Sequence, residues 1–252
     1  MNVRELSVAE LADVAGDVPF VRWGVGVGNV ARAWTAPEGG PVAVERYRRA
    51  YGTSLTVVGD GDAALRVAAR LAPRLDVGSV TLPRAAVVPD DVAFGPGAAG
   101  VRWEWMWTDA EPPPVPGEER VVELDGDSAA VRSELAAFLA AHSPGHSAEP
   151  GDEHTRVWLG VRAPDGDLLA CLALYQAVPG VDLMASVAVA AGARGQGLGL
   201  AIASAGTRRM LREGPPVATV DLYSDNAAAR ALYRRLGYRL DQEFTSYPVR
   251  AA

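Results

Sequence analysis

The residues best suited to chemistry form a glycine-rich segment in the C-terminal half of this 252-residue chain. An apolar run, residues 187–189, leads to the sequence Arg194-Gly195-Gln196-Gly197-Leu198-Gly199, and a helical pattern follows. Glycines can adopt positive φ and let a backbone approach a ligand closely. Free N–H groups at the start of the helix favour a negative charge, and Arg194 adds a cation at the mouth. The segment therefore predicts a cradle for a phosphate or diphosphate group.

Three interpretations of this segment compete. The glycines could serve only a tight turn. A dinucleotide site of the form G-x-G-x-x-G would need a small residue where Leu200 or Ile202 stands, although Asp221 follows at about the distance of a ribose-binding acid. The third pattern is R-x-x-G-x-G, and it is matched by Arg194, Gly197 and Gly199.

A second motif follows the glycine-rich segment, because residues 226–238 read N-A-A-A-R-A-L-Y-R-R-L-G-Y. The two motifs together resemble the R-x-x-G-x-G and N-x-x-A-x-x-L-Y-x-x-x-G-[FY] segments of the GCN5-related N-acetyltransferase (GNAT) superfamily. The resemblance covers residues 120–249. It implies an α+β fold with a mixed, mostly antiparallel sheet flanked by helices. It also implies transfer of an acetyl group from acetyl-CoA to a primary amine by direct attack on the thioester.

The resemblance also assigns the cofactor site. In this fold two neighbouring strands diverge, and the pantetheine arm of coenzyme A lies between them. Val187, Ala188 and Val189 would contact the thioester arm, where a backbone N–H would polarise the carbonyl. Asn226 would contact the pantetheine arm, although Asn is equally suited to capping a helix. The residues expected around the pyrophosphate are Arg194, Gly195, Gln196, Gly197, Leu198 and Gly199.

Two side chains are candidates for proton transfer. Tyr233 matches the family's tyrosine near the CoA sulfur, where a phenol can protonate the departing thiolate; the alternative is a core aromatic. Many members of the family place a basic glutamate on the strand before the glycine-rich segment. Residues 181–189 offer Asp182 and Ser186 but no glutamate. Asp182 is therefore the candidate general base, and a strand-edge carboxylate is the alternative.

The other reactive side chains predict structural roles and no metal site. Cys171 is the only cysteine and lies in an apolar run, which indicates a core residue and a reducing compartment. His142, His146 and His154 lie in or beside a Pro/Gly-rich stretch without the spacing of a zinc site, so we expect loop residues.

The patterns around these motifs predict the elements that position them. In the C-terminal half we expect strands at 120–124, 157–162, 168–176, 181–189, 217–223 and 238–249, with helices at 127–141, 198–212 and 226–236. In the N-terminal half we expect strands at 54–58, 77–82 and 101–107 and a helix at 63–71.

The proline cluster at 109–117 predicts a linker. It would join an N-terminal α/β domain, 1–108, to the acetyltransferase domain, 118–252. The N-terminal domain could be a degenerate GNAT half. Trp103, Trp105 and Trp107 share one strand face, and we expect them to pack or to line the acceptor site.

Composition narrows the choice of partners. A net charge of −7 argues against nucleic-acid binding. No apolar run reaches the roughly 20 residues of a membrane span, and no signal-peptide pattern begins the chain, so we expect a cytoplasmic protein, monomeric or homodimeric. The leading function is acetylation of a small-molecule amine. The alternatives are a protein or peptide N-acetyltransferase, a non-catalytic acyl-CoA sensor and, least favoured, a dinucleotide oxidoreductase.

Overall fold

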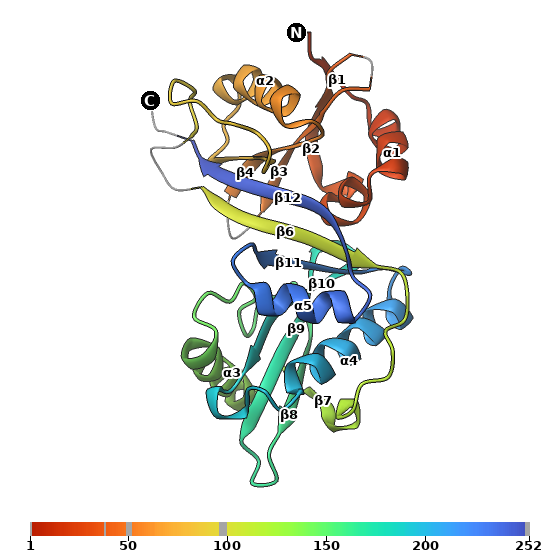
Figure 1. Cartoon of the computed structure of the whole chain (residues 1–252), viewed down its shortest axis with the longest axis vertical. Helices are drawn as coiled ribbons and strands as arrows, with labels where there is room; N and C mark the ends of the chain where they lie inside the picture. Colours follow the sequence, from red (N-terminus) through yellow and green to blue (C-terminus); the bar gives the residue numbers. More distant parts are fainter. Residues whose placement is uncertain (1, 38, 49–51, 96–99, 250–252) are drawn as a thin grey trace. The chain divides into compact units, whose positions relative to one another are not determined.

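The computed structural model describes residues 2–37, 39–48, 52–95 and 100–249 (Figure 1). The chain forms two compact units, and neither is continuous in sequence. The first unit comprises Met1–Trp105, Leu222–Asp225 and Leu240–Ala252, and the second comprises Met106–Asp221 and Asn226–Arg239. The sequence predicts domains at 1–108 and 118–252. These limits place residues 222–225 and 240–252 in the second domain, whereas the compact units place them in the first. As limits of functional domains, 1–108 and 118–252 stay a prediction.

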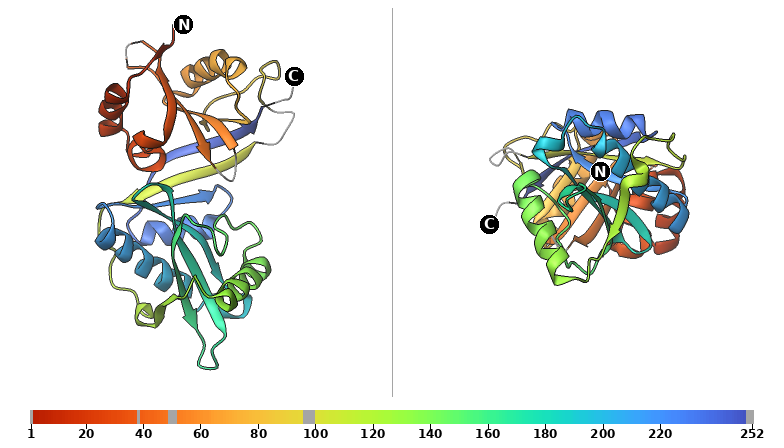
Figure 2. Two further views of the ribbon diagram at one scale, coloured as in Figure 1. Left: turned by 180° about the vertical axis from the view of Figure 1, so that it is seen from behind. Right: turned by 90° about the horizontal axis from the view of Figure 1, so that it is seen from below.

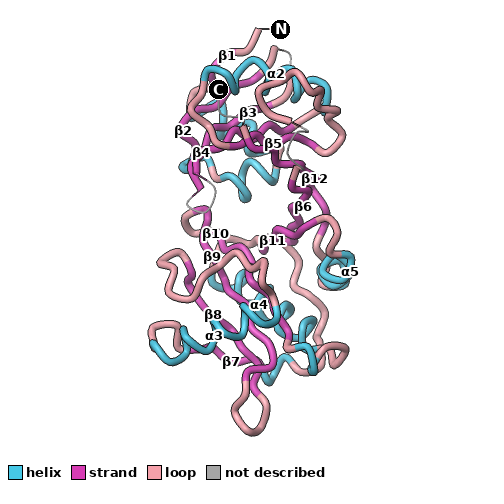
Figure 3. The backbone as a smooth tube through the Cα atoms, turned by 90° about the vertical axis from the view of Figure 1, so that its left-hand side faces the viewer, coloured by secondary structure: helices cyan, strands magenta, loops and turns pink. Residues whose placement is uncertain are grey.

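The second unit contains a sheet in the order β11-β10-β9-β8-β7. Its strands are β7 (Val121–Leu124), β8 (Thr155–Arg162), β9 (Leu168–Val178), β10 (Val181–Val189) and β11 (Ala218–Tyr223), the last belonging to this unit as far as Asp221. Its helices are α3 (Ala129–His142), α4 (Leu198–Glu213) and α5 (Ala227–Arg235), with short turns η4 (Glu118–Arg120) and η5 (Ala191–Ala193). Strands β10 and β11 pair in parallel, and the pairs β7–β8, β8–β9 and β9–β10 are antiparallel. Figure 3 shows β8, β9 and β10 alongside one another.

Helices cover both faces of this sheet. Cys171 and Ala173 of β9 belong to a core cluster with Leu135 and Leu139 of α3. Their neighbour Leu172 points the other way, because side chains alternate along a strand, and it meets α4 at Gly206. Figure 2 shows α3 in green and α4 in blue on opposite sides of the strands.

The first unit contains a sheet in the order β1-β2-β3-β4-β5-β12-β6. Its strands are β1 (Arg4–Glu5), β2 (Val30–Thr35), β3 (Val42–Arg48), β4 (Gly52–Val58), β5 (Ser79–Pro83), β6 (Val101–Thr108, to Trp105 in this unit) and β12 (Arg239–Pro248, from Leu240). Its helical segments are α1 (Val8–Asp17), η1 (Phe20–Val25), η2 (Val27–Asn29), α2 (Gly61–Leu71) and η3 (Ala72–Arg74). Residues of β4, α2 and β5 form its main core cluster, which includes Leu55, Val67 and Leu82.

Two of the three tryptophans of β6 pack inside the first unit. Trp105 is 1% exposed and meets the Phe20 ring edge-on, with the ring centroids 5.4 Å apart. Trp103 stacks against Phe244 of β12 at 4.7 Å. Trp107 belongs to the second unit, where the Arg239 guanidinium lies 4.0 Å from its ring centroid. These contacts favour packing over a role in a binding surface.

The sequence predicts the architecture well from residue 54 onward. The mixed, mostly antiparallel sheet flanked by helices is confirmed, and β10 has the predicted bounds of 181–189. The elements before residue 50, α1, β2 and β3, were not predicted. The register of β2 shifts between Val30 and Arg32, which interrupts the alternation that marks a strand.

Candidate functional site

Strands β10 and β11 begin side by side and then part. Their parallel pairing joins Leu183 to Thr219 and Met184 to Val220. Both strands continue, to Val189 and Tyr223, and within the described chain no later residues of the two strands are paired with each other. The backbone groups of residues 185–189 on the β11 side therefore have no β11 partner, and such groups must be satisfied by something else.

A bulge interrupts β10 at this point. Its pairing with β9 changes register between Ala185 and Ala188, which face Ala173 and Cys171. Ser186 lies in the bulge and is the only non-glycine residue with positive φ, 51°, among the described residues. A bulge turns the backbone locally, so it redirects the N–H groups of the residues that follow.

The glycine-rich segment leads from β10 into α4. The φ angles of Gly195 and Gly197 are 78° and 81°, in the left-handed region that glycine adopts without strain. A Cβ atom built at Gly192, Gly195 or Gly197 would meet nothing within 4 Å, so this side of the loop is open. The loop is held from within, because Gln196 Nε2 donates to the Gly192 carbonyl at 3.3 Å.

Helix α4 is the only described α-helix that begins without a capping side chain. The other four have a side-chain oxygen that accepts a backbone N–H, provided by Ser7, Asp60, Ser128 and Asn226. At the start of α4 stands Gly197, which has none to offer. The N–H groups of the first turn have no acceptor within a helix, and the helix dipole adds partial positive charge. The start of α4 can therefore receive an anion through bare backbone N–H groups.

The side chain of Arg194 braces this loop. Its Nε donates to the Val189 carbonyl at 3.3 Å, and its Nη2 donates to the His142 carbonyl at 3.2 Å. It thus links the end of β10 to the end of α3 beside the anion cradle. Its direct contact with a ligand stays a prediction.

Tyr233 lies on α5 and is only 4% exposed. Burial raises the pKa of its phenol, and the neighbouring Tyr238, with ring centroids 5.3 Å apart, raises it further. A phenol with a raised pKa keeps its proton at neutral pH, so Tyr233 has a hydroxyl hydrogen to offer to a thiolate, although it is a weaker acid than an exposed tyrosine. Among the described residues its hydroxyl has no hydrogen-bond partner, whereas the Tyr238 hydroxyl lies 2.9 Å from Thr207 Oγ1 on α4.

Asp182 is fully engaged by its neighbours. Its carboxylate is 4% exposed and accepts from Arg156 Nε at 3.1 and 3.2 Å, from Arg156 Nη2, and from Gln176 Nε2 at 3.0 Å. The hydrogen bond to Asp182 raises the pKa of Arg156, and Glu213, at 2.7 Å from Nη1, contributes as well. These contacts argue for a structural role, and the assignment of Asp182 as general base stays a prediction.

The remaining predicted residues have ordinary surroundings. Asn226 Oδ1 accepts the Ala229 N–H at 3.0 Å, so it caps α5, while its contact with a cofactor stays a prediction. Cys171 is completely buried, and burial raises the pKa of its thiol to about 12. His146 Nδ1 donates to the Ser143 carbonyl at 2.9 Å. Across the described residues, no group of three or more His, Cys, Asp or Glu side chains could hold a metal ion, and no helix is long and apolar enough to cross a membrane.

The first unit also contains a pair of parallel strands with a helix between them in sequence. At the start of that helix, however, there is no open space for an anion. Strands β4 and β5 pair in parallel from Ser54↔Ser79 to Thr56↔Thr81, and α2 follows β4. Here Asp60 Oδ1 caps the helix by accepting from the Ala63 N–H at 3.0 Å. The next residue, Gly61, lies so close to the backbone of residues 85–86 that a Cβ would stand 2.8 Å from an atom there. The start of α2 therefore has no room for an anion and carries a carboxylate of its own.

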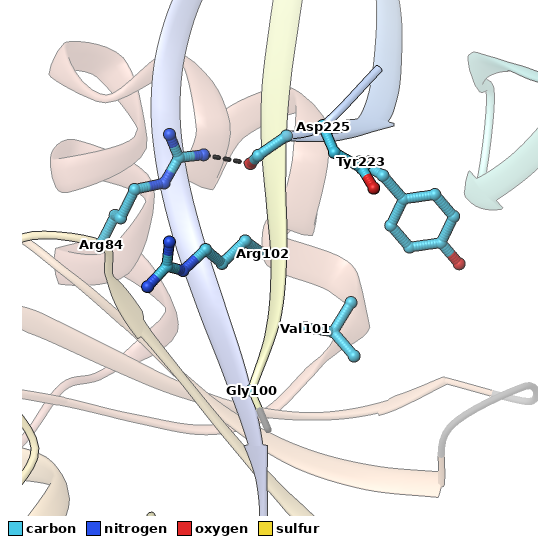
Figure 4. A pocket seen from close by; sticks show the side chains of 7 residues that line it. Arg84, Gly100, Val101, Arg102, Tyr223 and Asp225 are labelled. Carbon is cyan, nitrogen blue, oxygen red and sulfur yellow. Dashed lines mark hydrogen bonds between the residues drawn. The ribbon is translucent and has the colours of Figure 1, made fainter. Parts of the chain in front are cut away.

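A separate cavity of about 540 Å³ lies in the first unit (Figure 4). Its lining residues are Arg84, Gly100, Val101, Arg102, Tyr223, Ser224 and Asp225. Arg84 is used by the fold, because it donates to Ser224 Oγ, to Glu104 Oε1 at 3.2 Å and to Glu243 Oε1 at 2.5 Å. None of the residues predicted for the site lines this cavity.

Comparison with known proteins finds a family model that matches part of the chain and solved structures with a similar fold. Residues 122–238 match a family model described as the acetyltransferase (GNAT) family. No curated protein matches the sequence. A GNAT-family acetyltransferase from Novosphingobium aromaticivorans has a similar structure, with 23% identity, a TM-score of 0.53 and coverage of 77% of this chain and 82% of its own.

Two further solved structures agree. The GCN5-related N-acetyltransferase from Sphaerobacter thermophilus is 18% identical, with a TM-score of 0.52 over 100% of this chain and 96% of its own. The one from Kribbella flavida is 18% identical, with a TM-score of 0.51 over 86% and 89%. At these identities the likeness shows the fold alone.

The buried ion pair of Asp182 gives a test of its structural role. Arg156→Met should lower the free energy of unfolding by roughly 3–5 kcal/mol, because it leaves a buried carboxylate without its cation. Arg162→Met is the matched control, since Arg162 and its partner Glu134 are 32% and 35% exposed. That pair should contribute about 0–1 kcal/mol. Urea unfolding of the three proteins measures both losses, and equal losses would contradict the interpretation.

Proposed function

Because residues 122–238 form a domain of the acetyltransferase (GNAT) family, we propose that this chain transfers an acetyl group from acetyl-CoA to the primary amine of a small molecule. Acyl-CoA-dependent acetyl transfer is the activity that the family implies. The small-molecule acceptor is the finer part of the proposal, as are the roles of individual residues.

One observation carries the proposal: the uncapped start of α4, reached through two glycines with positive φ, lies directly after a strand that parts from its parallel neighbour. The first feature suits a diphosphate, because bare N–H groups and a helix dipole favour an anion. The second leaves Val187, Ala188 and Val189 without a β11 partner, and a pantetheine arm would take that place, while the Val189 carbonyl also accepts from Arg194 Nε. Coenzyme A has both a diphosphate and an amide-bearing arm, so one ligand would satisfy both sets of groups.

The proposed residue roles follow from this placement. Backbone amides from Gly195 to Gly199 would hold the pyrophosphate, and Asn226 would contact the pantetheine arm. A β10 N–H beside the bulge would polarise the thioester carbonyl. The substrate ammonium would lose a proton to a base, for which Asp182 is the candidate, and its nitrogen would then attack the carbonyl carbon. As the C–S bond breaks, Tyr233 would give its proton to the sulfur and recover one from the acetylated nitrogen.

A non-catalytic acyl-CoA sensor is the second candidate. It is favoured by the engaged state of Asp182, since β10 has no other carboxylate to act as a base. Release of free thiol from acetyl-CoA in the presence of an amine panel separates the two functions, because a sensor binds acetyl-CoA without consuming it. Adding a lysine-containing peptide to the panel tests the protein or peptide acceptor.

The cradle gives the first prediction. Gly197→Ala should raise the Kd for acetyl-CoA about tenfold, because an L-residue at φ 81° is strained by roughly 1–2 kcal/mol and its methyl group faces the open side. Gly192→Ala is the control: its φ is not in the left-handed region, its Cβ meets nothing, and the Kd should stay within about twofold. Calorimetric titration measures both, and an unchanged Kd for Gly197→Ala would contradict the placement of the pyrophosphate.

The proton donor gives the second prediction. Tyr233→Phe should lower kcat about 100-fold, because the thiolate then leaves without its proton, while the Kd for acetyl-CoA stays nearly unchanged. Tyr238→Phe is the matched control, since it removes a buried hydroxyl from the adjacent ring and should have a much smaller effect on kcat. Steady-state turnover by thiol release measures both. Equal turnover by Tyr233→Phe and the wild-type protein would remove this role.

The candidate base gives the third prediction. If Asp182 accepts the proton, Asp182→Asn lowers kcat about 100-fold and changes the acidic side of the pH–rate profile. Glu213→Gln is the control, because Glu213 is the other carboxylate on Arg156 and is not assigned to the reaction. An unshifted profile with near-normal turnover in Asp182→Asn would show that the base is another group.

A further inference from the structure

Ser186 has two properties that no other described residue combines. Its backbone is left-handed, at φ 51°, although it has a side chain. Its hydroxyl makes two hydrogen bonds to a single residue, Ala148: Oγ accepts from the Ala148 N–H at 2.8 Å and donates to the Ala148 carbonyl at 3.1 Å. A left-handed non-glycine residue persists only where its surroundings hold it there. These two hydrogen bonds help to do so, together with the weak one that the Ser186 carbonyl accepts from Cys171 Sγ at 3.9 Å.

The partner residue lies in the loop between α3 and β8, residues 143–154. Ala148 is 1% exposed and packs in the same core cluster as Ala185 and Ala188, the residues on either side of the bulge. Short-range turns hold other parts of the loop, with the His146 N–H donating to the Ser143 carbonyl at 2.9 Å and the Asp152 N–H to the Glu149 carbonyl at 3.1 Å. The end of the loop is tied to β9, because the His154 carbonyl accepts from the Gln176 N–H at 2.9 Å. The Ser186 hydroxyl therefore provides the side-chain link that fixes the middle of this loop to β10.

Two other buried hydroxyls of the second unit also make two contacts each. Thr108 Oγ1 accepts from the Ala110 N–H at 3.2 Å and donates to the Ala110 carbonyl at 3.4 Å. Thr207 Oγ1 donates to the Ala203 carbonyl at 2.8 Å and lies 2.9 Å from the Tyr238 hydroxyl, whereas Ser204 Oγ makes a single donation, to Glu118 Oε1 at 2.7 Å. Among the described residues, Ser186 alone combines such contacts with a left-handed non-glycine backbone, on a bulge that precedes the strand residues assigned to the thioester.

We propose that Ser186 is a positioning residue for acetyl transfer, holding the loop 143–154 against the bulge of β10 so that the acceptor amine is presented to the thioester. The proposal rests on the proposed function of the same site. The bulge directly precedes Val187, and the loop meets the bulge through Ala148. In this proposal one hydroxyl couples the strand assigned to the donor to a loop that would border the acceptor.

Two substitutions separate the hydroxyl from the backbone strain. Ser186→Ala removes both hydrogen bonds and keeps the strained φ, whereas Ser186→Gly removes the hydrogen bonds and adopts the same φ without strain. Ser186→Gly is therefore expected to fold even if Ser186→Ala does not. Ser204→Ala is the matched control, because it also deletes a buried serine hydroxyl from the second unit.

The measurement is thiol release with the panel amine that the wild-type protein acetylates fastest. We expect both Ser186 variants to raise the KM for the amine about tenfold, in line with the loss of two neutral hydrogen bonds, while the KM for acetyl-CoA stays within about twofold. The Ala148 amide hydrogen should also exchange with solvent at least about tenfold faster, because it has lost its acceptor. Ser204→Ala should change neither KM value.

Three results would overturn the proposal. The amine KM of both Ser186 variants could equal that of the wild-type protein, or the KM values for amine and acetyl-CoA could rise together, as general damage to the fold would cause. Either result refutes the positioning role and leaves the proposed function intact. If the wild-type protein itself released no thiol with any amine, the proposed function would fail, and the positioning role with it.

Discussion

The backbone N–H groups in the first turn of an α-helix have no carbonyl acceptor within that helix. The described α-helices of this protein differ in what accepts these N–H groups. Four of the α-helices that the structure describes use a side-chain oxygen at their start, from Ser7, Asp60, Ser128 or Asn226. Helix α4 begins at a glycine and has no such oxygen. The N–H groups of its first turn therefore have no side-chain acceptor at the helix start. An anion would accept these N–H groups and would also be stabilised by the helix dipole.

The residues of the loop before α4 keep this helix start open to an anion and hold the loop in place. Gly195 and Gly197 adopt backbone angles that would strain other residues, so the loop needs no bulky side chain to turn. Gln196 and Arg194 hold the loop through carbonyl groups of Gly192, Val189 and His142, none of which uses the donors of α4. The side chains thus brace the loop, and the backbone N–H groups of α4 are left for an anion; a contact between Arg194 and that anion stays a prediction.

The start of α2 in the first unit shows how a helix start of this kind is closed to an anion. It has the same succession of a strand, a short turn and a helix, with a parallel neighbouring strand. One aspartate at the helix start, Asp60, satisfies the donor that a ligand would use, and the backbone near Ala85 occupies the space. Placing a carboxylate at the positive end of the helix also repels an incoming anion. Within the described chain, both units thus contain a parallel strand pair with a helix between the strands in sequence, and the two helix starts differ in their chemistry.

The sequence by itself determined the motifs, the type and limits of most elements after residue 54, and the family fold, because those depend on short-range patterns: apolar periodicity, glycine and proline positions, and capping residues. It did not determine the partners of Asp182, since Arg156 and Gln176 meet it only when β8, β9 and β10 are side by side. It could not show that β12 pairs with β5, or that Ser186 holds Ala148, 38 residues away along the chain. Hydrogen bonds of that kind leave no periodic signal, because they join side chains and peptides that only the packed sheet brings within hydrogen-bond distance of one another. Tertiary structure alone decided which polar groups of the site are already engaged and which remain free for a ligand.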